Sequence, residues 1–392
     1  MKKPILSVLI ASLQVVLFAQ GSFDVAETLK KSVEEYMPLI QMEKPEGKPS
    51  ARWTYYDGNV VCVGFQDWTS GFYPGCLWYL YQYSKDSKIK AEAIKSTKAI
   101  EGVTTYGGNH DVGFRAYCSF GNAYKQTGES FYKEGIVTAA KTLMTRYNDK
   151  IGLIMSWNPN KKRDWKFPVI IDNMMNLELL FEATKISGDK TYHNAAVAHA
   201  DKTLANHFRP NNSSYHVVDY DPETGAVRHR NTHQGMNDES AWARGQAWGL
   251  YGYVVCYRYT KDKKYLDQAL KIKNFYLNHP NLPTDLVPYW DFDVNGDPNL
   301  PRDVSASALV ASALVELAEY LPKQKDELIA SASKILESIA NNYMNDNSKQ
   351  HPNLLLNGST GSVPHKSEIN TPIIYADYYF LEALVRLNEL KK

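Results

Sequence analysis

The sequence predicts an all-α protein, a closed ring of about twelve helices called an (α/α)6 toroid or six-hairpin barrel. Two observations support this fold class. Apolar, aromatic-rich helical segments recur six times along the chain, each preceded by a Gly or acidic residue with polar neighbours. More polar, amphipathic helical segments lie between them. Six apolar helices inside six amphipathic ones is the layout of this toroid.

The apolar segments are the predicted inner helices. They start at Asp67, Asn109, Asp172, Ala243, Asp303 and Tyr375. Short charged turns such as SKDSK and TKDKK often follow them. Because the starts of the inner helices converge at one end of a closed ring, we expect residues at these starts to share one mouth.

The amphipathic segments are the predicted outer helices. They cover residues 25–37, 88–99, 131–147, 192–207, 265–278 and 326–343. An open helical solenoid would show the same alternation, but its last repeat would need a polar outer face. The last segment, IIYADYYFLEALVRLNEL, has no such face and must pack on something. We therefore predict that the ring closes on its first repeat and that residues 20–392 form a single domain.

The composition describes a globular chain that is unusually rich in aromatic residues. With 44% apolar and 22% charged residues among 392, it can bury a large core. A formal net charge of +1 without basic runs argues against nucleic acid or an anionic membrane as a partner. The 27 Tyr and 8 Trp residues exceed the needs of packing, and such rings stack on pyranose faces.

Residues 1–19 have the pattern of a secretory signal peptide, with Lys2 and Lys3, an apolar run and a small residue at Ala19. An uncleaved membrane anchor is the alternative, although polar residues interrupt the run and it is short for a bilayer span. No Cys follows Ala19 to accept a lipid. We expect export to the periplasm or the medium, with no membrane partner after cleavage.

The four cysteines, Cys62, Cys76, Cys118 and Cys256, lie far apart without the spacing of zinc ligands. We expect buried free thiols, although export would permit a Cys62–Cys76 disulfide. No metal site and no cofactor are predicted.

Residues 232–253, THQGMNDESAWARGQAWGLYGY, are the stretch richest in sugar-handling side chains. The spacing of apolar residues predicts a helix that starts near Ser240 and carries Trp242, Arg244 and Trp248 close to its start. Backbone N–H groups and the helix dipole favour an anion there. The alternative is that the tryptophans are core residues and that Arg244 pairs with a nearby acid.

Convergence at the mouth gathers these scattered residues into one candidate site. The inner starts supply Trp68, Asp111, Asp172, Arg244, Asp303 and Asp377, and the loops add Trp157, His216, His233 and Gln234. For each aspartate the alternative is a helix N-cap, the commonest role of Asp before an apolar run. We assign Asp303, Asp377 and Asp238 to that role.

The motifs of this site resemble those of glycoside hydrolase family 88, the unsaturated glucuronyl hydrolases. The matching stretches are DWTSGFYPG, NHDVGF, IIDNMMNLELL, THQGMNDESAWARGQAWGLYGY and IYADYYFLEAL. Together they extend over nearly the whole chain after the predicted signal peptide, and ARGQAWGLYGY is the most specific of them.

The resemblance implies that Asp172 is the general acid and base, and that Asp111 supports it and helps to hold the substrate. It also implies sugar-binding roles for Trp68, Trp157, His216, Gln234, Arg244 and Trp248, beside which we place His233. The family hydrates the double bond of the 4,5-unsaturated uronic acid that polysaccharide lyases leave at the non-reducing end, without a cofactor. The expected partner is therefore an unsaturated oligosaccharide of the glycosaminoglycan type.

The residues around Asp172 agree with an acid and base role. Asp172 lies between Ile171 and Asn173-Met174-Met175, and desolvation among apolar neighbours raises the pKa of a carboxyl group. A second carboxylate raises it further, toward the neutral range that proton exchange requires. The helix start acts in the opposite direction, and the sequence does not decide between these effects. Arg244, with its fixed fork of donors, is expected to bind the carboxylate of the substrate.

The loop over residues 356–371 precedes the sixth inner helix and should reach the same mouth. Its Ser362, His365 and Lys366 could hold a sulfated or N-acetylated second sugar, and the alternative is a solvated loop without ligand contact. The other basic cluster expected near the mouth is Lys161, Lys162 and Arg163.

Three other functions are compatible with the sequence. Family 105, the unsaturated rhamnogalacturonyl hydrolases, shares the toroid and the hydration chemistry, but ARGQAWGLYG favours family 88. A polysaccharide lyase can use the same toroid. In a non-catalytic sugar-binding protein, the aspartates would only cap helices.

Overall fold

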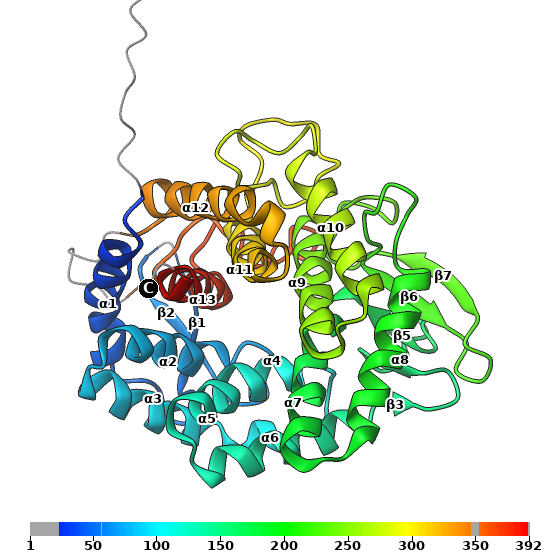
Figure 1. Ribbon diagram of the computed structural model, residues 1–392, viewed down its shortest axis with the longest axis horizontal. Helices are drawn as coiled ribbons and strands as arrows, with labels where there is room; N and C mark the ends of the chain where they lie inside the picture. Colours follow the sequence, from blue (N-terminus) through cyan, green and yellow to red (C-terminus); the bar gives the residue numbers. More distant parts are fainter. Residues whose placement is uncertain (1–22, 56, 346–352, 391–392) are drawn as a thin grey trace, which may run out of the picture.

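The computed structural model describes residues 23–55, 57–345 and 353–390, in which the helices form two concentric layers around one axis (Figure 1). The inner layer consists of α2 (Phe72–Ser84), α4 (Val112–Ala116) with the π-helix η2 (Tyr117–Gly121) and α5 (Asn122–Thr127), α7 (Leu177–Ser187), α9 (Ala243–Thr260), α11 (Val304–Tyr320) and α13 (Ile374–Leu390). The outer layer consists of α1 (Val25–Gln41), α3 (Ser87–Ala99), α6 (Ser130–Met144), α8 (Lys190–Asn206), α10 (Lys263–Leu277) and α12 (Lys325–Asn342). Because α4, η2 and α5 follow one another without a break, the described residues contain the predicted twelve helices.

The two layers follow from the two kinds of helix in the sequence. Every residue of α11 from Val304 to Ala318 is buried, as expected of a helix that is apolar on all sides. By contrast, α12 buries a single stripe at Leu328, Ala332, Ile335, Leu336 and Ile339. An inner helix therefore has neighbours all round, whereas an outer helix keeps a polar face.

Tight turns connect the inner helices to the outer helices at one end of the ring. Lys85 ends α2 in the left-handed conformation, and the side chain of Asp86 then accepts hydrogen bonds from the first backbone N–H groups of α3. Gly188 and Asp189 make the same turn between α7 and α8. These are the charged turns that the sequence shows after its apolar segments.

The ring closes, as predicted, because α13 packs between α11 and α2 and also contacts α1. Gly75 of α2 permits this contact, since a Cβ atom there would lie 2.5 Å from Tyr378 of α13. Both ends of the described chain meet the last turn of α2, where Tyr83 donates to the carbonyl of Ala26 and Gln82 donates to Glu389. An open solenoid is excluded.

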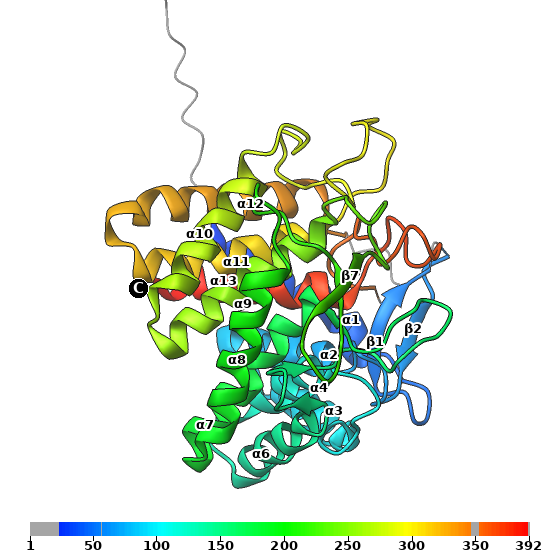
Figure 2. The same cartoon turned by 90° about the vertical axis from the view of Figure 1, so that its right-hand side faces the viewer.

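The prediction of an all-α protein missed three small antiparallel sheets. They pair β1 (Ser50–Thr54) with β2 (Val60–Val63), β3 (Tyr147–Asn148) with β4 (Leu153–Ile154), and β5 (Pro168–Ile170) with β6 (Val217–Tyr220) and then β7 (Val227–Asn231). The strands and the longer loops gather on one side of the ring (Figure 2). This is the end at which the inner helices start.

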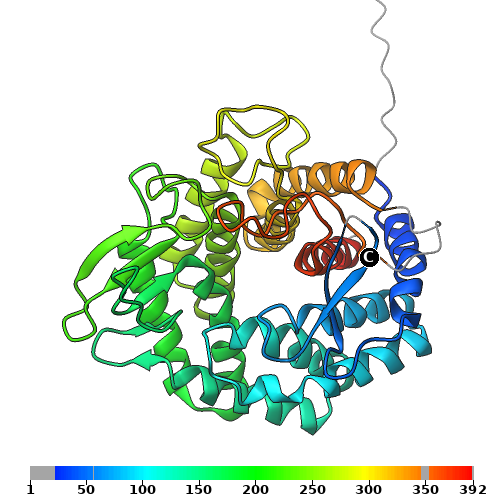
Figure 3. The same cartoon turned by 180° about the vertical axis from the view of Figure 1, so that it is seen from behind.

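The N-terminal hairpin and the segment before α13 meet at that end of the ring (Figure 3). The backbone N–H of Thr54 in β1 donates to Pro372, and the hydroxyl of Thr371 donates to the carbonyl of Thr54 at 2.5 Å. Trp53 and Ile373 form an isolated antiparallel bridge beside them. Residues from both ends of the sequence thus build the same rim.

Buried ion pairs join the inner helices toward the C-terminal ends of α9, α11 and α13. Arg258 of α9 pairs with Glu178 and Glu316, and Arg386 of α13 pairs with Glu316 at 2.6 Å and with Glu382 at 3.1 Å. The network therefore links four of the six inner helices through charged groups that lie inside the ring.

The described cysteines are all buried free thiols, as expected, and the Cys62–Cys76 disulfide is not formed. Among the described residues, every helix is too short or too polar to cross a bilayer. The predicted signal peptide, residues 1–19, lies outside the described residues.

Candidate active site

A cavity of about 280 Å³ opens at the end of the ring where the inner helices start. Its lining residues come from the inner starts, from the loops and from β1: Arg52, Trp68, His110, Asp111, Trp157, Ile170, Asp172, His233, Gln234, Arg244, Gly361, Ser362, His365, Ser367, Glu368 and Tyr375. The predicted convergence is thus found for residues that lie more than 300 positions apart in the chain.

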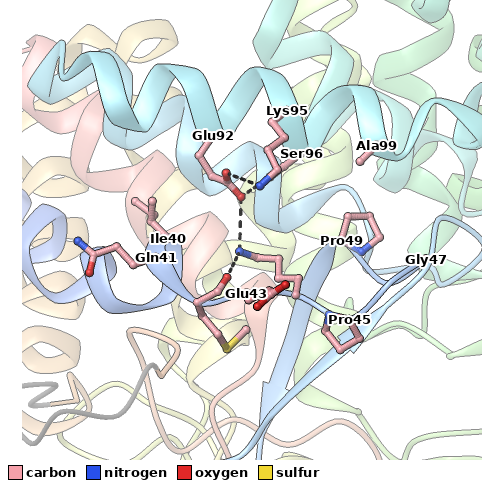
Figure 4. A pocket seen from close by; sticks show the side chains of 12 residues that line it. Ile40, Gln41, Glu43, Pro45, Gly47, Pro49, Glu92, Lys95, Ser96 and Ala99 are labelled. Carbon is pink, nitrogen blue, oxygen red and sulfur yellow. Dashed lines mark hydrogen bonds and ion pairs between the residues drawn. The ribbon is translucent and has the colours of Figure 1, made fainter.

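A larger cavity of about 540 Å³ lies elsewhere, between the end of α1 and α3 (Figure 4). Its buried cation, Lys44, donates to the carbonyls of Leu39 and Met42 and to Glu92, at 3.3 to 3.5 Å. The described residues that line it include no aromatic side chain. It therefore lacks the stacking surface that a sugar site uses.

Asp172 lies in the 3-10 helix η3 (Ile171–Asn176), directly after β5. Strand pairing holds it there, because β5 pairs with β6 and the N–H of Ile171 donates to the carbonyl of His216. The Asp172 side chain is 13% exposed, and its Oδ2 atom is buried without a hydrogen-bond partner. Its side chain therefore does not act as the N-cap that was the alternative interpretation.

The pKa of Asp172 is raised to about 7. Burial is the main cause, since it penalises the charged form, and the nearby carboxylate of Asp111 adds to it. The positive charge of Arg244 and the backbone N–H of Asp172 act in the opposite direction. Desolvation thus outweighs the opposing effects, which the sequence alone did not decide.

His216 lies behind Asp172, and its Nε2 is 3.8 Å from Asp172 Oδ2. His216 Nδ1 accepts the backbone N–H groups of His233 and Gln234, both at 3.1 Å, so the ring proton is on Nε2 and faces the carboxyl group. Burial holds the pKa of His216 well below its usual range, which keeps the ring neutral. His216 faces Asp172 and does not line the cavity, so its contact with the sugar stays a prediction.

Asp111 precedes α4 and makes no capping bond with its side chain. Its Oδ1 is 3.3 Å from Nε2 of His110. Asn176 determines the tautomer of this histidine, because its Oδ1 accepts the N–H groups of Gly113 and Phe114 and its amide group can then only donate to His110 Nδ1. His110 consequently directs its Nε2 proton at Asp111.

Arg244 reaches the cavity as predicted, but its guanidinium group is not free. The residue is 1% exposed and forms an ion pair with Asp303. It also donates to the carbonyls of Thr360 and Gly361, both at 2.6 Å. The alternative, pairing with a nearby acid, is therefore found. These bonds engage three of the five N–H donors of Arg244, which also lines the cavity, so its contact with the carboxylate of the substrate stays a prediction.

The three aspartates assigned to helix caps have other partners. Asp303 makes no capping bond, because its carboxylate pairs with Arg244 and accepts the hydroxyl of Ser305. Asp377 accepts the N–H groups of Leu355 and Leu356, in the loop before its own helix. Asp238 accepts the N–H of Thr232 at 2.8 Å. The carboxylates of Asp377 and Asp238 thus fix loops, whereas that of Asp303 joins the start of α11 to α9.

Of the three predicted tryptophans, Trp68 and Trp157 line the cavity and Trp248 does not. Trp248 is 0% exposed and packs on Phe114 and Tyr379, with ring centroids 5.0 and 5.6 Å away. It is a core residue that does not line the cavity, so the structure does not support its predicted contact with substrate, which stays a prediction. The sequence pattern is the same for a buried and a lining tryptophan on an inner helix.

The side of the cavity near Trp157 is aromatic and polar. Trp157 stacks on Trp165 with centroids 5.2 Å apart, and the ring of His233 lies 5.0 Å from Trp157. Burial, together with the nearby His365, lowers the pKa of His233 to about 4. Gln234 donates to the carbonyl of Gly361 at 3.1 Å. This side therefore offers a flat apolar surface next to neutral hydrogen-bonding groups.

The predicted loop before α13 does reach the mouth. Ser362 and His365 both line the cavity, and the Ser362 hydroxyl lies 2.8 Å from His365 Nδ1. Lys366 is exposed and does not line the cavity. Ser362 therefore lies where the predicted contact with the second sugar requires it, whereas Lys366 does not.

Among the lining residues that were not proposed as site residues from the sequence are Arg52, Glu368 and Tyr375. Arg52 of β1 pairs with Asp67 and donates to Glu368 at 2.7 Å, and Glu368 and Tyr375 also line the cavity. Arg52 precedes the helical pattern on a five-residue strand, where nothing in the sequence indicates its direction. Tyr375 belongs to the motif IYADYYFLEAL, but its helical spacing is equally typical of a core residue.

The comparison with known proteins agrees with this site. A model of Glycosyl Hydrolase Family 88 matches residues 30–384. An unsaturated glucuronyl hydrolase of Formosa agariphila is 50% identical over 330 residues, which are 84% of this chain and 82% of the relative.

Two solved structures show the same fold. The crystal structure of an unsaturated glucuronyl hydrolase specific for heparin has a TM-score of 0.89 at 43% identity and covers 94% of this chain and 97% of its own. An unsaturated glucuronyl hydrolase mutant of Streptococcus agalactiae, complexed with dGlcA-GalNAc6S, has a TM-score of 0.79 at 29% identity and covers 98% of both chains. In sequence, in fold and over its length, the chain belongs to glycoside hydrolase family 88, the unsaturated glucuronyl hydrolases.

Proposed function

We propose that this enzyme hydrates the C4=C5 double bond of the 4,5-unsaturated uronic acid at the non-reducing end of lyase-produced glycosaminoglycan oligosaccharides. The observation that carries the proposal is Asp172, a carboxyl group with a pKa of about 7 at the wall of a sugar-sized cavity. Such a group is protonated and ionised in comparable amounts near neutral pH. It can therefore give a proton and take one back.

The reaction begins when Asp172 transfers its proton to C4 of the unsaturated sugar. The π electrons of C4=C5 form the new C–H bond, and positive charge develops at C5 and the ring oxygen. Water then adds to C5 and returns a proton to the Asp172 carboxylate. The resulting hemiketal opens by cleavage of the bond between C5 and the ring oxygen, which exposes a hemiacetal at C1 that releases the second sugar.

The groups around Asp172 suit this proton exchange. The Nε2 proton of His216 faces the carboxyl oxygen that has no partner, so it stabilises the carboxylate each time the proton leaves. The fixed tautomer of His110 leaves Asp111 an acceptor, which can bind a sugar hydroxyl next to the reacting atoms. Trp68 and Trp157 provide apolar walls for the flat unsaturated ring.

The substrate class follows from the cavity together with its relatives. A related structure is specific for heparin, and another holds a disaccharide written as an unsaturated glucuronate joined to a sulfated N-acetylgalactosamine. The side of the cavity near Trp157, with His233, Ser362 and His365, offers polar groups to a second sugar of this kind. We infer a substrate with an amino sugar in the second position.

The test is to follow the ultraviolet absorbance of the C4=C5 chromophore with unsaturated heparin and chondroitin disaccharides. We expect the wild type to remove the absorbance, and Asp172→Asn to lose at least about 10²-fold in rate, because the amide cannot exchange a proton. An Asp172→Asn variant that kept a tenth of the activity would reject the catalytic role of this residue.

The same assay separates the alternatives. Faster turnover of the unsaturated rhamnogalacturonan disaccharide would favour the chemistry of family 105. A gain of absorbance from intact polymer would indicate a lyase. Binding of the disaccharide without any change of absorbance would indicate a sugar-binding protein.

We also propose that the enzyme is exported and that residues 1–19 are removed. The support is the Lys-led apolar run that ends at Ala19. N-terminal sequencing of the protein from its native host should find a start near Gln20, and an intact Met1 would reject the proposal.

A further inference from the structure

Tyr375, at the start of α13, combines two properties that rarely occur together. The residue is 0% exposed, yet it lines the active-site cavity. Its hydroxyl group is buried and has no hydrogen-bond partner. Folded proteins seldom leave a buried hydroxyl unpaired, so a ligand that enters the cavity is the natural partner for this one.

The surroundings of Tyr375 favour an anionic acceptor. The guanidinium carbon of Arg244 lies 5.2 Å from the centroid of the Tyr375 ring, and the ring of Trp68 lies 5.0 Å away. Burial raises the pKa of the Tyr375 hydroxyl, so it keeps its proton at neutral pH and acts as a donor. A neutral donor beside a guanidinium group suits a carboxylate better than a sugar hydroxyl.

The two arginines of the cavity already have acidic partners. Arg244 pairs with Asp303, and Arg52 pairs with Asp67 and Glu368. A carboxylate that entered would meet guanidinium groups whose charge is already paired, while the Tyr375 hydroxyl has no partner. The positive field of Arg244 still acts at short range, and it draws the anionic end of a substrate toward this wall.

We propose that the Tyr375 hydroxyl positions the substrate by donating a hydrogen bond to the carboxylate at C5 of the unsaturated uronic acid. This inference rests on the proposed function, since it needs a uronate in the cavity. The bond leaves the carboxylate ionised beside C5, where positive charge develops in the transition state. Tyr375 thus gives the site its preference for a uronic acid over a neutral unsaturated sugar.

The experiment measures binding in the inactive Asp172→Asn background, with the unsaturated heparin disaccharide and its uronate methyl ester as ligands. Adding Tyr375→Phe should weaken the Kd for the acid by about 10- to 100-fold, the effect expected for a hydrogen bond to a charged group. The Kd for the ester should change much less, because the ester is a weaker acceptor. In the otherwise wild-type enzyme, Tyr375→Phe should raise KM more than it lowers kcat.

Tyr132→Phe is the matched control, because the Tyr132 hydroxyl is also buried without a partner but lies on the outer helix α6. Neither substitution should lower Tm, since neither hydroxyl bonds to the protein, and only Tyr375→Phe should change the Kd. An unchanged Kd for the acid, or equal losses for acid and ester, would overturn the role of Tyr375. A wild type without activity on any unsaturated uronate would instead reject the proposed function, while the binding comparison would still read out Tyr375.

Discussion

At the scale of the residue, several effects act on the carboxyl group of Asp172, and their strengths differ for structural reasons. Burial has its full effect on the pKa of this group, because β5 places Asp172 on the inner wall of the ring. The opposing field of Arg244 is weakened, because Asp303 neutralises much of its charge. The partnership of Arg244 with Asp303 therefore helps to keep Asp172 in the range where it can act as an acid.

The raised pKa of Asp172 has a cost in stability. A carboxyl group with a folded pKa of about 7 holds its proton to higher pH than it does in the unfolded chain, whose value is about 3.9. Between these values the folded state binds more protons, so stability falls as pH rises, by up to about 1.4 kcal/mol per pH unit.

Asp172→Asn removes this penalty. The variant should exceed the wild type in free energy of unfolding at pH 8, the excess should be smaller at pH 5, and it should vanish below about pH 4. Urea unfolding at the three values measures it. The exposed Asp149 provides the control, since Asp149→Asn should show no such trend. An excess that did not depend on pH would contradict the prediction.

Selectivity for the second sugar is expected at His365 rather than at Lys366. His365 lines the cavity and bonds with Ser362, whereas Lys366 is exposed and outside the lining. A partly exposed polar contact contributes no more than about 1 kcal/mol, so His365→Ala should lower the ratio of kcat/KM for sulfated over unsulfated disaccharide by about fivefold. Lys366→Ala should change that ratio by less than about twofold. A larger effect of Lys366→Ala than of His365→Ala would show that Lys366 determines this selectivity.

At the scale of the element, helices were predictable and strands were not. The alternation of apolar and amphipathic segments has a period that a dozen residues suffice to show, so all twelve helices were found. Strands β3 and β4 have two residues each, too few for any period. Their existence depends on partners that only the closed ring brings together.

The residues of the site also fall into those that the sequence could predict and those that it could not. Asp111, Asp172 and Trp68 were predictable, because motif and helix start together determine where they lie, and Gln234 was predictable from the motif of its loop. The burial of Trp248 and the acidic partner of Arg244 were not, since an inner helix presents side chains both to the cavity and to its neighbours. Whether a given side chain faces one or the other depends on contacts with Asp303 or Phe114, which come from other helices.

The ion pairs between the inner helices should contribute strongly to stability. Glu316 accepts from both Arg258 and Arg386, and these two arginines hold its pKa below the usual range. Glu316→Gln leaves two largely buried cations with one acidic partner fewer. It should lower the free energy of unfolding by about 2 to 4 kcal/mol at pH 7.

Because the folded pKa of Glu316 is depressed, its contribution is fully present above the unfolded value of about 4.3 and is lost progressively as pH falls from there toward the folded pKa. The difference between wild type and variant should therefore shrink in acid. Denaturant unfolding at pH 7 and pH 4 checks both points. Glu223, exposed and paired with Lys150, is the matched control, and Glu223→Gln should leave Tm unchanged. An equally small effect at Glu316 would show that the network is dispensable.

At the scale of the whole molecule, the closed ring implies that chain connectivity can change without loss of the fold. The contacts of α13 with α2 and α11 close the ring, and none of them depends on where the chain is cut. A circular permutant that joins residue 390 to residue 23 by a flexible linker and opens between Gly188 and Asp189 should fold and keep activity. Circular dichroism and the absorbance assay measure the two properties.

A second permutant, opened between residues 363 and 364, should fold but lose activity, because the cut lies in the loop that carries Ser362 and His365. If the permutant opened at Gly188 failed to fold while this one folded, the turn between α7 and α8 would be needed for folding.

The contacts of Ala26 and Glu389 with the last turn of α2 place both ends of the described chain on the face of the ring opposite the catalytic mouth. Substrate enters through one face, and whatever is attached to the chain leaves from the other. A tether, a fusion partner or a solid support joined at either end would therefore leave the approach of a long oligosaccharide unobstructed. One face of the ring thus carries the catalytic mouth, and the opposite face carries both ends of the described chain, where an attachment can be made.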